Sequence, residues 1–226
     1  MTGLSEEFWR ARGQRASNAL LTVVSAVPVV GGPIVTFLAG VISSREAARV
    51  EEVLAWVRER LDLLGLRVEE LADRPDAETL AELLERSLVG AASSAHVAKR
   101  EAYAALIVNG IADLDPNHEE QRFFVDIVDR SRPIHIRALQ LMATGTSPDD
   151  ERTIADAFPE LAHDSPILEL ANLASQDLAT WGLTQGPKSF QIHHLLREFN
   201  ATGLTDLGRR CLAYITMPAG EATHST

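Results

Sequence analysis

The sequence predicts a predominantly all-α protein, in which a helical N-terminal bundle is followed by a smaller module with one short β-hairpin. Apolar residues recur at helical spacing along most of the chain, and aromatic residues make up only 5% of it. No long run alternates apolar and polar residues as a large half-buried sheet would. The 226 residues are 46% hydrophobic and 23% charged, so the chain has enough apolar material to bury a globular core.

The first expected element is a helical hairpin in residues 19–42, a run without any charged side chain. Proline lacks the N–H that a continuous helix needs, so each arm of about ten residues covers only about half of a bilayer. We therefore expect a bend in the middle of the run. Its hinge residues are Pro28, Gly31, Gly32 and Pro33.

A helix that is apolar on all sides has to be covered by something. The residues of this hairpin that we expect at an interface or facing a membrane are Val30, Ile34, Phe37, Leu38 and Val41. Three alternatives remain for what buries this hairpin: the protein's own core, a second polypeptide, and a membrane into which the hairpin inserts. The nearby Phe8, Trp9, Arg10, Arg12 and Arg15 suit an interfacial segment, and equally an ordinary amphipathic first helix.

Three longer helices complete the N-terminal region, residues 1–114. Residues 45–65 form an apolar stripe that ends at Gly65, comprising Val50, Val53, Leu54, Val57, Leu61 and Leu64. Residues 74–88 bring four leucines to one face, Leu80, Leu83, Leu84 and Leu88. Residues 93–114 form an alanine-rich helix, in which we expect the Asn109 amide to bond to a neighbouring backbone.

The C-terminal module is expected at residues 115–217, followed by a flexible tail at 218–226. Its first helix starts after Asp115 and carries an apolar face of Phe123, Phe124, Ile127 and Val128. Shorter helices follow at 135–143 and 147–158, and a longer one at 165–181 is closed by Gly182. The best candidate for a short strand is "KSFQIH", residues 188–193.

The stretches "LATWGL" at 178–183 and "LTDLGRRCLAYI" at 204–215, in which Thr205 caps the last helix, resemble a winged-helix module. The resemblance covers residues 132–217, and it implies binding to DNA, RNA or protein. The possible nucleic-acid or partner contacts that it implies are Asn172, Gln176, Lys188, Arg209 and Arg210. The "PVVGGP" segment is loosely similar to that of uncharacterised bacterial helical proteins, which implies no activity.

The expected recognition helix, residues 166–181, argues against DNA. Its outer face is predicted to carry Glu169, Asn172, Ser175, Gln176 and Asp177, and the helix contains no Lys or Arg. DNA recognition relies on basic side chains for phosphates and bases, and the whole chain carries a net charge of −11. A protein-binding or dimerising use of this helix fits better.

Catalytic and metal-site signatures are missing from the sequence. There is no phosphate-binding loop, dinucleotide fingerprint, zincin motif or hydrolase elbow. Asp113, Asp115 and Asn117 are spaced like the start of a calcium loop, but the central Gly and closing Glu are absent, so we interpret them as helix capping. Adjacent His193 and His194 point to opposite faces of a strand. We expect no catalytic residue, cofactor or metal.

Cys211 is the single cysteine, which excludes an intrachain disulfide and suggests a small buried residue. The first eighteen residues do not fit a signal peptide, so we expect a cytoplasmic protein, with peripheral attachment to a membrane as an alternative. Together these features predict a non-enzymatic interaction or assembly protein that forms oligomers. The alternatives are a membrane-active effector that inserts residues 19–42, and a winged-helix DNA-binding regulator.

Overall fold

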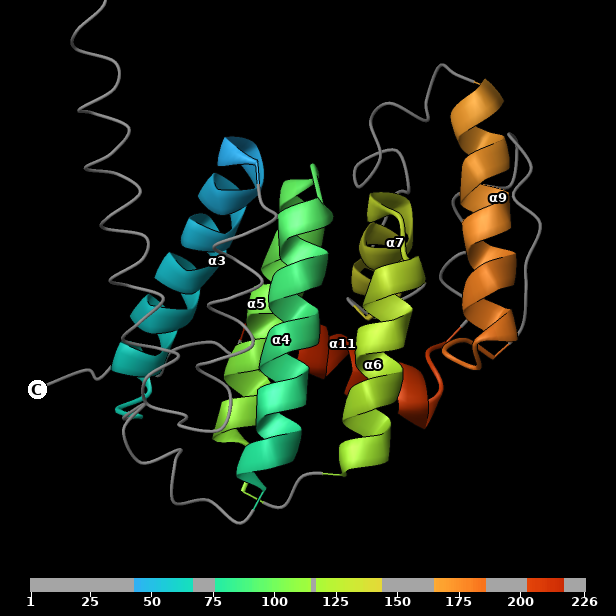
Figure 1. Ribbon diagram of the computed structural model, residues 1–226. Coiled ribbons are helices and arrows are strands. Elements are labelled where there is room, and N and C mark those ends of the chain that lie inside the picture. Colours follow the sequence, from blue (N-terminus) through green and yellow to red (C-terminus); the bar gives the residue numbers. More distant parts are fainter. Residues whose placement is uncertain (1–42, 67–75, 115–116, 144–164, 186–202, 218–226) are drawn as a thin grey trace, which may run out of the picture. The chain divides into compact units, whose positions relative to one another are not determined.

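The computed structural model describes residues 43–66, 76–114, 117–143, 165–185 and 203–217 (Figure 1). Within these ranges the chain forms seven helices, and its only extended pairing is an isolated antiparallel bridge between Thr184 and Leu204. The prediction of a predominantly all-α protein is confirmed. The predicted β-hairpin is not seen, because the connection at 186–202, with its expected strand, lies outside the described residues, as do the hairpin of 19–42 and the helix at 147–158.

The chain divides into two compact units. Of the described residues, those up to Val125 and those at 215–217 belong to unit 1, and those between Asp126 and Tyr214 belong to unit 2. Residues 215–217 are therefore part of the same unit as residues 43–66, although they are far from them in the sequence. There the Asn109 side-chain amide donates a hydrogen bond of 3.1 Å to the carbonyl of Thr216, which is the kind of backbone partner predicted for it.

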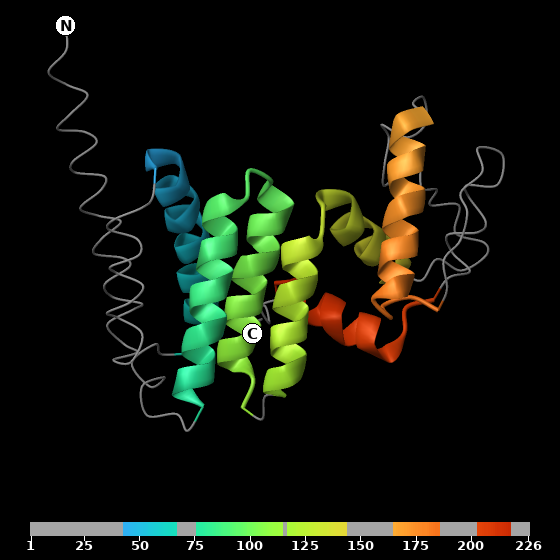
Figure 2. The same cartoon turned by 45° about the vertical axis from the view of Figure 1, so that its right-hand side comes forward.

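Unit 1 is built on three helices that lie side by side in Figures 1 and 2: α3 (Ser44–Leu63), α4 (Ala77–Ser93) and α5 (Val97–Ala112). The predicted stripes of α3 and α4 are buried, except that Leu64 is half-exposed. Helix α5 is buried on nearly all sides. A Cβ at Gly90 or Gly110 would lie 2.3 Å from the side chain of Tyr103 or Leu83, so these two glycines let α4 and α5 approach closely.

Helix α3 begins with a capping box. The Ser43 hydroxyl accepts from the Glu46 N–H at 3.4 Å, and the Glu46 carboxylate accepts from the Ser43 N–H at 2.7 Å. The hydrogen bond with the Ser43 side chain, and then the one with its backbone, lower the pKa of Glu46 below its ordinary value.

A buried arginine connects α3 to the turn between α4 and α5. Arg100 is 7% exposed, and its Nε lies 2.8 Å from the Glu52 carboxylate on α3. Its Nη1 donates to the carbonyls of Ser94 at 3.2 Å and Ala95 at 2.9 Å. Arg49 donates to the carbonyl of Ala92 at 2.9 Å. Carbonyls at the end of α4 that lack helical partners are thus satisfied by side chains.

Unit 2 contains the end of α6 (His118–Arg130), α7 (Pro133–Ala143), α9 (Ser165–Thr180) and most of α11 (Asp206–Ile215). Helices α7 and α9 pack against each other (Figure 2). Gly182 closes α9 with a φ of 74°, as predicted. The Thr205 hydroxyl accepts from the Gly208 N–H at 2.9 Å, which confirms the predicted cap of α11. Cys211 is fully buried, also as predicted.

Replacing Ser87 on α4 is expected to stabilise unit 1. The Ser87 side chain is fully buried, and its hydroxyl has no hydrogen-bond partner in the described part of the chain. Ser87→Ala removes this unsatisfied group and should raise the free energy of unfolding in urea by about 1 kcal/mol. The control is Ser93→Ala on the same helix, where the hydroxyl is exposed and donates to the Val89 carbonyl at 3.0 Å. A Ser87→Ala variant less stable than this control would contradict the assignment.

Replacing Gly208 on α11 is expected to destabilise unit 2. A Cβ at this position would lie 2.0 Å from the Leu183 carbonyl oxygen, which belongs to the backbone and cannot simply rotate away. Gly208→Ala should lower the free energy of unfolding by about 2 kcal/mol or more. Gly203→Ala is the matched control, since its Cβ would meet only the Gln185 side chain, at 3.5 Å. Equal stability of the two variants would disprove the close approach.

Candidate functional site

One face of α9 is exposed and begins with two leucines. Leu170 is 39% exposed and Leu173 is 53% exposed, while Ala174 and Leu178 on the other side of the helix are buried. Residues three apart on a helix are neighbours, so the two leucines form one apolar surface. Further along the same face the exposed residues are Gln176, Asp177 and Thr180. We call the five exposed residues, Leu170, Leu173, Gln176, Asp177 and Thr180, the α9 face.

The C-terminal end of this face is held by His135 of α7. The N–H of Arg132 donates to His135 Nδ1 at 2.9 Å, so this nitrogen is an acceptor and the ring carries its hydrogen on Nε2. That nitrogen lies 3.1 Å from Asp177 Oδ2 and donates to it. The imidazole also stacks on Trp181, with 5.2 Å between ring centroids. Since His135 is buried, these contacts fix α9 against the start of α7.

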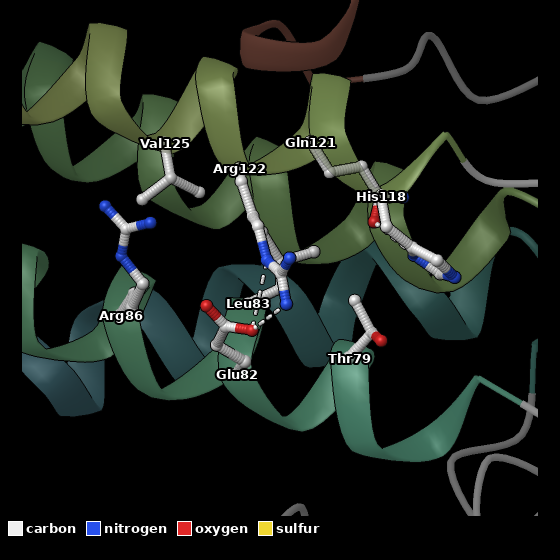
Figure 3. A pocket seen from close by; sticks show the side chains of 8 residues that line it. All are labelled: Thr79, Glu82, Leu83, Arg86, His118, Gln121, Arg122 and Val125. Carbon is white, nitrogen blue, oxygen red and sulfur yellow. Dashed lines mark hydrogen bonds and ion pairs between the residues drawn. The ribbon is translucent and has the colours of Figure 1, made fainter.

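A second candidate is a shallow groove in unit 1, between α4 and the first turns of α6 (Figure 3). Its lining residues are Thr79, Glu82, Leu83, Arg86, His118, Gln121, Arg122 and Val125. Arg122 points from α6 toward Glu82 on α4, with 2.7 Å between Nη2 and the carboxylate, and its Nη1 lies 3.2 Å from Glu119. The hydrogen bond with Glu82 and the charge of Glu82 raise the pKa of Arg122 above its ordinary value.

This groove is a poor binding site. The space open to the centre of a water molecule is about 10 Å³, which is room for roughly one water, whereas small-molecule pockets measure about 300–1,000 Å³. The Arg122 charge is balanced by two carboxylates, so it offers little attraction to an anion. The pair of Arg122 and Glu82 in this groove connects the start of α6 to α4. At that start, Asn117 Oδ1 accepts from the Glu120 N–H at 3.2 Å, in agreement with the predicted capping.

In the described residues, no three His, Cys, Asp or Glu side chains come together where a metal ion would be held. None of the helices seen in those ranges has both the length and the apolar content to cross a bilayer.

Only some of the site residues predicted from the sequence lie in the part of the chain that the structure describes. The hinge residues Pro28, Gly31, Gly32 and Pro33, the interface residues Val30, Ile34, Phe37, Leu38 and Val41, and Lys188 lie outside the described residues. Asn172 is on α9, but its side chain is outside what the structure describes. Gln176 is exposed on the α9 face. Arg210 is exposed on α11, and Arg209 donates to the Leu204 carbonyl at 2.9 Å and pairs with Asp206.

The prediction for the outer face of α9 was partly wrong. Ser175, expected on this face, is 2% exposed, and the leucines at 170 and 173 were not expected there. The helix has apolar residues on more than one side, so periodicity alone does not identify the buried face. The large number of leucines in α9 was the sequence feature that could have indicated an exposed apolar face.

Comparison with known proteins gives no further guidance, since no family model, curated protein or solved structure matches the chain.

His135→Phe is expected to loosen the contact between α7 and α9. Phenylalanine keeps a ring against Trp181 but leaves the Arg132 N–H and Asp177 without their partner. The free energy of unfolding should fall by about 1–3 kcal/mol. In the control, Asp177→Asn, the amide oxygen still accepts from Nε2, so a smaller loss is expected. If His135→Phe unfolds at the same urea concentration as the wild type, His135 does not hold α9.

Proposed function

We propose that the protein is a non-enzymatic interaction protein that binds another polypeptide through the α9 face. The observation that carries this proposal is the pair of exposed leucines, Leu170 and Leu173, on a helix without any basic residue. Fully burying a leucine contributes about 1.5–3 kcal/mol, and since these two are 39% and 53% exposed, burying what remains of both contributes about as much as burying one leucine.

The anchoring of α9 supports the proposal. His135, buried between Arg132 and Asp177, fixes one end of the helix before any partner arrives. A surface that is already ordered loses less conformational entropy on binding, so more of the burial energy remains as affinity. The α9 face therefore combines apolar contact area with a fixed geometry.

The same face argues against nucleic acid as the partner. Leucine, glutamine and aspartate provide no cation for phosphates, and the guanidinium of Arg209 on α11 is engaged by Asp206 and a carbonyl. We retain the winged-helix resemblance as part of the proposal. The order α7, α9, antiparallel bridge and α11 supports it, with the module binding protein rather than DNA.

The groove in unit 1 is closed by the pair of Arg122 and Glu82 and has no room for a substrate, so the proposed binding does not involve it. We further propose a cytoplasmic protein. The membrane-active alternative rests on residues 19–42, and flotation of the full-length protein with liposomes separates it from the present proposal.

Site-specific photo-crosslinking tests the proposed function. A photoreactive amino acid at position 173, introduced in the cells that produce the protein, should give one discrete adduct with a polypeptide. The matched control is position 114, where the natural leucine is 87% exposed but lies outside α9. The adduct at 173 should be lost when Leu170→Asp is added. Equal labelling at 173 and 114, or no polypeptide adduct at either, would contradict the proposal.

A further inference from the structure

We infer that the cap at the start of α7 forms only while His135 is uncharged, so that mild acid opens it. The inference concerns this cap alone and does not rest on the proposed function. In a capping box, the side chain at the third helical position accepts a hydrogen bond from the backbone N–H of the residue before the helix. Glutamate or glutamine usually provides this acceptor, whereas α7 uses an imidazole nitrogen.

Helices α3 and α7 use the same position for different acceptors. In α3 the third helical residue is Glu46, and its carboxylate accepts from the Ser43 N–H at 2.7 Å. In α7 the first helical residue is Pro133 and the third is His135, whose Nδ1 accepts from the Arg132 N–H at 2.9 Å. An ionised carboxylate has several lone pairs for this bond, but Nδ1 has a single one, which a proton occupies.

A proton on Nδ1 turns this bond into a repulsive contact. Both ring nitrogens of an imidazolium are donors, so two N–H groups would face each other across 2.9 Å. His135 is only 3% exposed, so water has little access to either group. A buried donor without an acceptor is unfavourable, and the contact is relieved when the backbone of Arg132 moves away from the ring. Protonation therefore releases the residue before α7.

The surroundings of the ring favour the uncharged form beside Nδ1 and the charged form beside Nε2. Nδ1 lies at the positive end of the α7 dipole, and the charged residues nearest in sequence, Arg132 and Arg137, are also positive. From α9, the Asp177 carboxylate faces Nε2 at 3.1 Å, but its side chain is 53% exposed, so water screens the attraction. Trp181, which stacks on the ring, is neutral. Since Nε2 carries hydrogen in both forms, acid opens the cap and leaves the bond to Asp177.

The two caps should respond to different ranges of pH. Imidazole side chains ordinarily change charge between about pH 5 and 8, whereas glutamate does so near pH 4. The hydrogen bonds with the side chain and the backbone of Ser43 lower the pKa of Glu46 further, so the α3 cap stays closed throughout the imidazole range. Mild acid therefore frees the connection between α6 and α7 but not the start of α3.

Urea unfolding of the full-length protein between pH 8 and pH 5 tests the inference, with the indole N–H NMR signal of Trp181 reporting on unit 2. The variant is His135→Gln, because glutamine accepts at the third helical position at every pH. The difference in urea midpoint between wild type and variant cancels the titration of groups that both share. As the pH falls, the wild-type midpoint should drop relative to that of the variant by roughly half a molar.

The matched control is Glu46→Gln, the same kind of change at the third position of α3, with Trp56 of that helix as the reporter. Its difference from the wild type should stay constant between pH 8 and pH 6, because Glu46 is ionised over this range. A midpoint difference for His135→Gln that does not depend on pH, or that moves in favour of the wild type in acid, overturns the inference.

If His135→Gln does not fold, NMR of the nitrogen-15-labelled wild type decides the question. The ring should carry hydrogen on Nε2 alone at pH 8 and on both nitrogens in acid. The protection of the Arg132 amide against hydrogen exchange, corrected for the intrinsic rate at each pH, should fall by about tenfold. Protection that persists at pH 5, or an Nδ1 that carries hydrogen already at pH 8, overturns the inference.

Discussion

Backbone groups at helix ends need hydrogen-bond partners, and this requirement organises both units of the protein. In unit 1 the last carbonyls of α4 and of the following turn are covered by Arg49 and Arg100, and Arg100 reaches Glu52 on α3 with the same guanidinium. The buried Arg100 side chain thus caps the end of α4 and also connects α5 to α3. Burying that charge is tolerable because several acceptors surround it, and for this reason its neighbours cannot be changed one at a time without cost.

In unit 2 the backbone group that needs a partner is the N–H of Arg132, at the start of α7. His135 accepts from the backbone at the start of α7 and donates to Asp177 on α9. Because the first bond fixes which ring nitrogen carries hydrogen, the second bond has a defined donor and direction. The histidine has a structural role, and the orientation of the α9 face follows from it. The binding surface that we propose is therefore a consequence of how a helix start is capped.

Much of the helical core was predictable from the sequence. The stripe from Val50 to Leu61 and the four leucines of α4 follow helical spacing, and their opposite faces are charged, so only one orientation buries them well. Thr205 and Gly182 were also identified, because a helix cap is decided by residues close together in the chain. Local signals were sufficient wherever one face of a helix was clearly polar.

The candidate site was less predictable. Helix α9 is apolar on several sides, so its spacing does not decide whether Ser175 or Leu173 is exposed; the neighbours from α7 decide it. Contacts such as the one between His135 and Asp177 join residues far apart in the sequence and leave no local pattern. The hairpin of residues 19–42 and the β-hairpin of the second module stay predictions, since both fall outside the described residues.

The net charge of −11 bears directly on the proposed binding role, because an acidic partner would be repelled. At physiological ionic strength this repulsion is screened beyond about 8 Å, while groups in direct contact are screened much less. The balance is therefore set by the few charges at the interface. Of the five residues that form the α9 face, only Asp177 is charged, and its carboxylate is bonded to His135. The binding that we propose therefore depends mainly on apolar contact through Leu170 and Leu173.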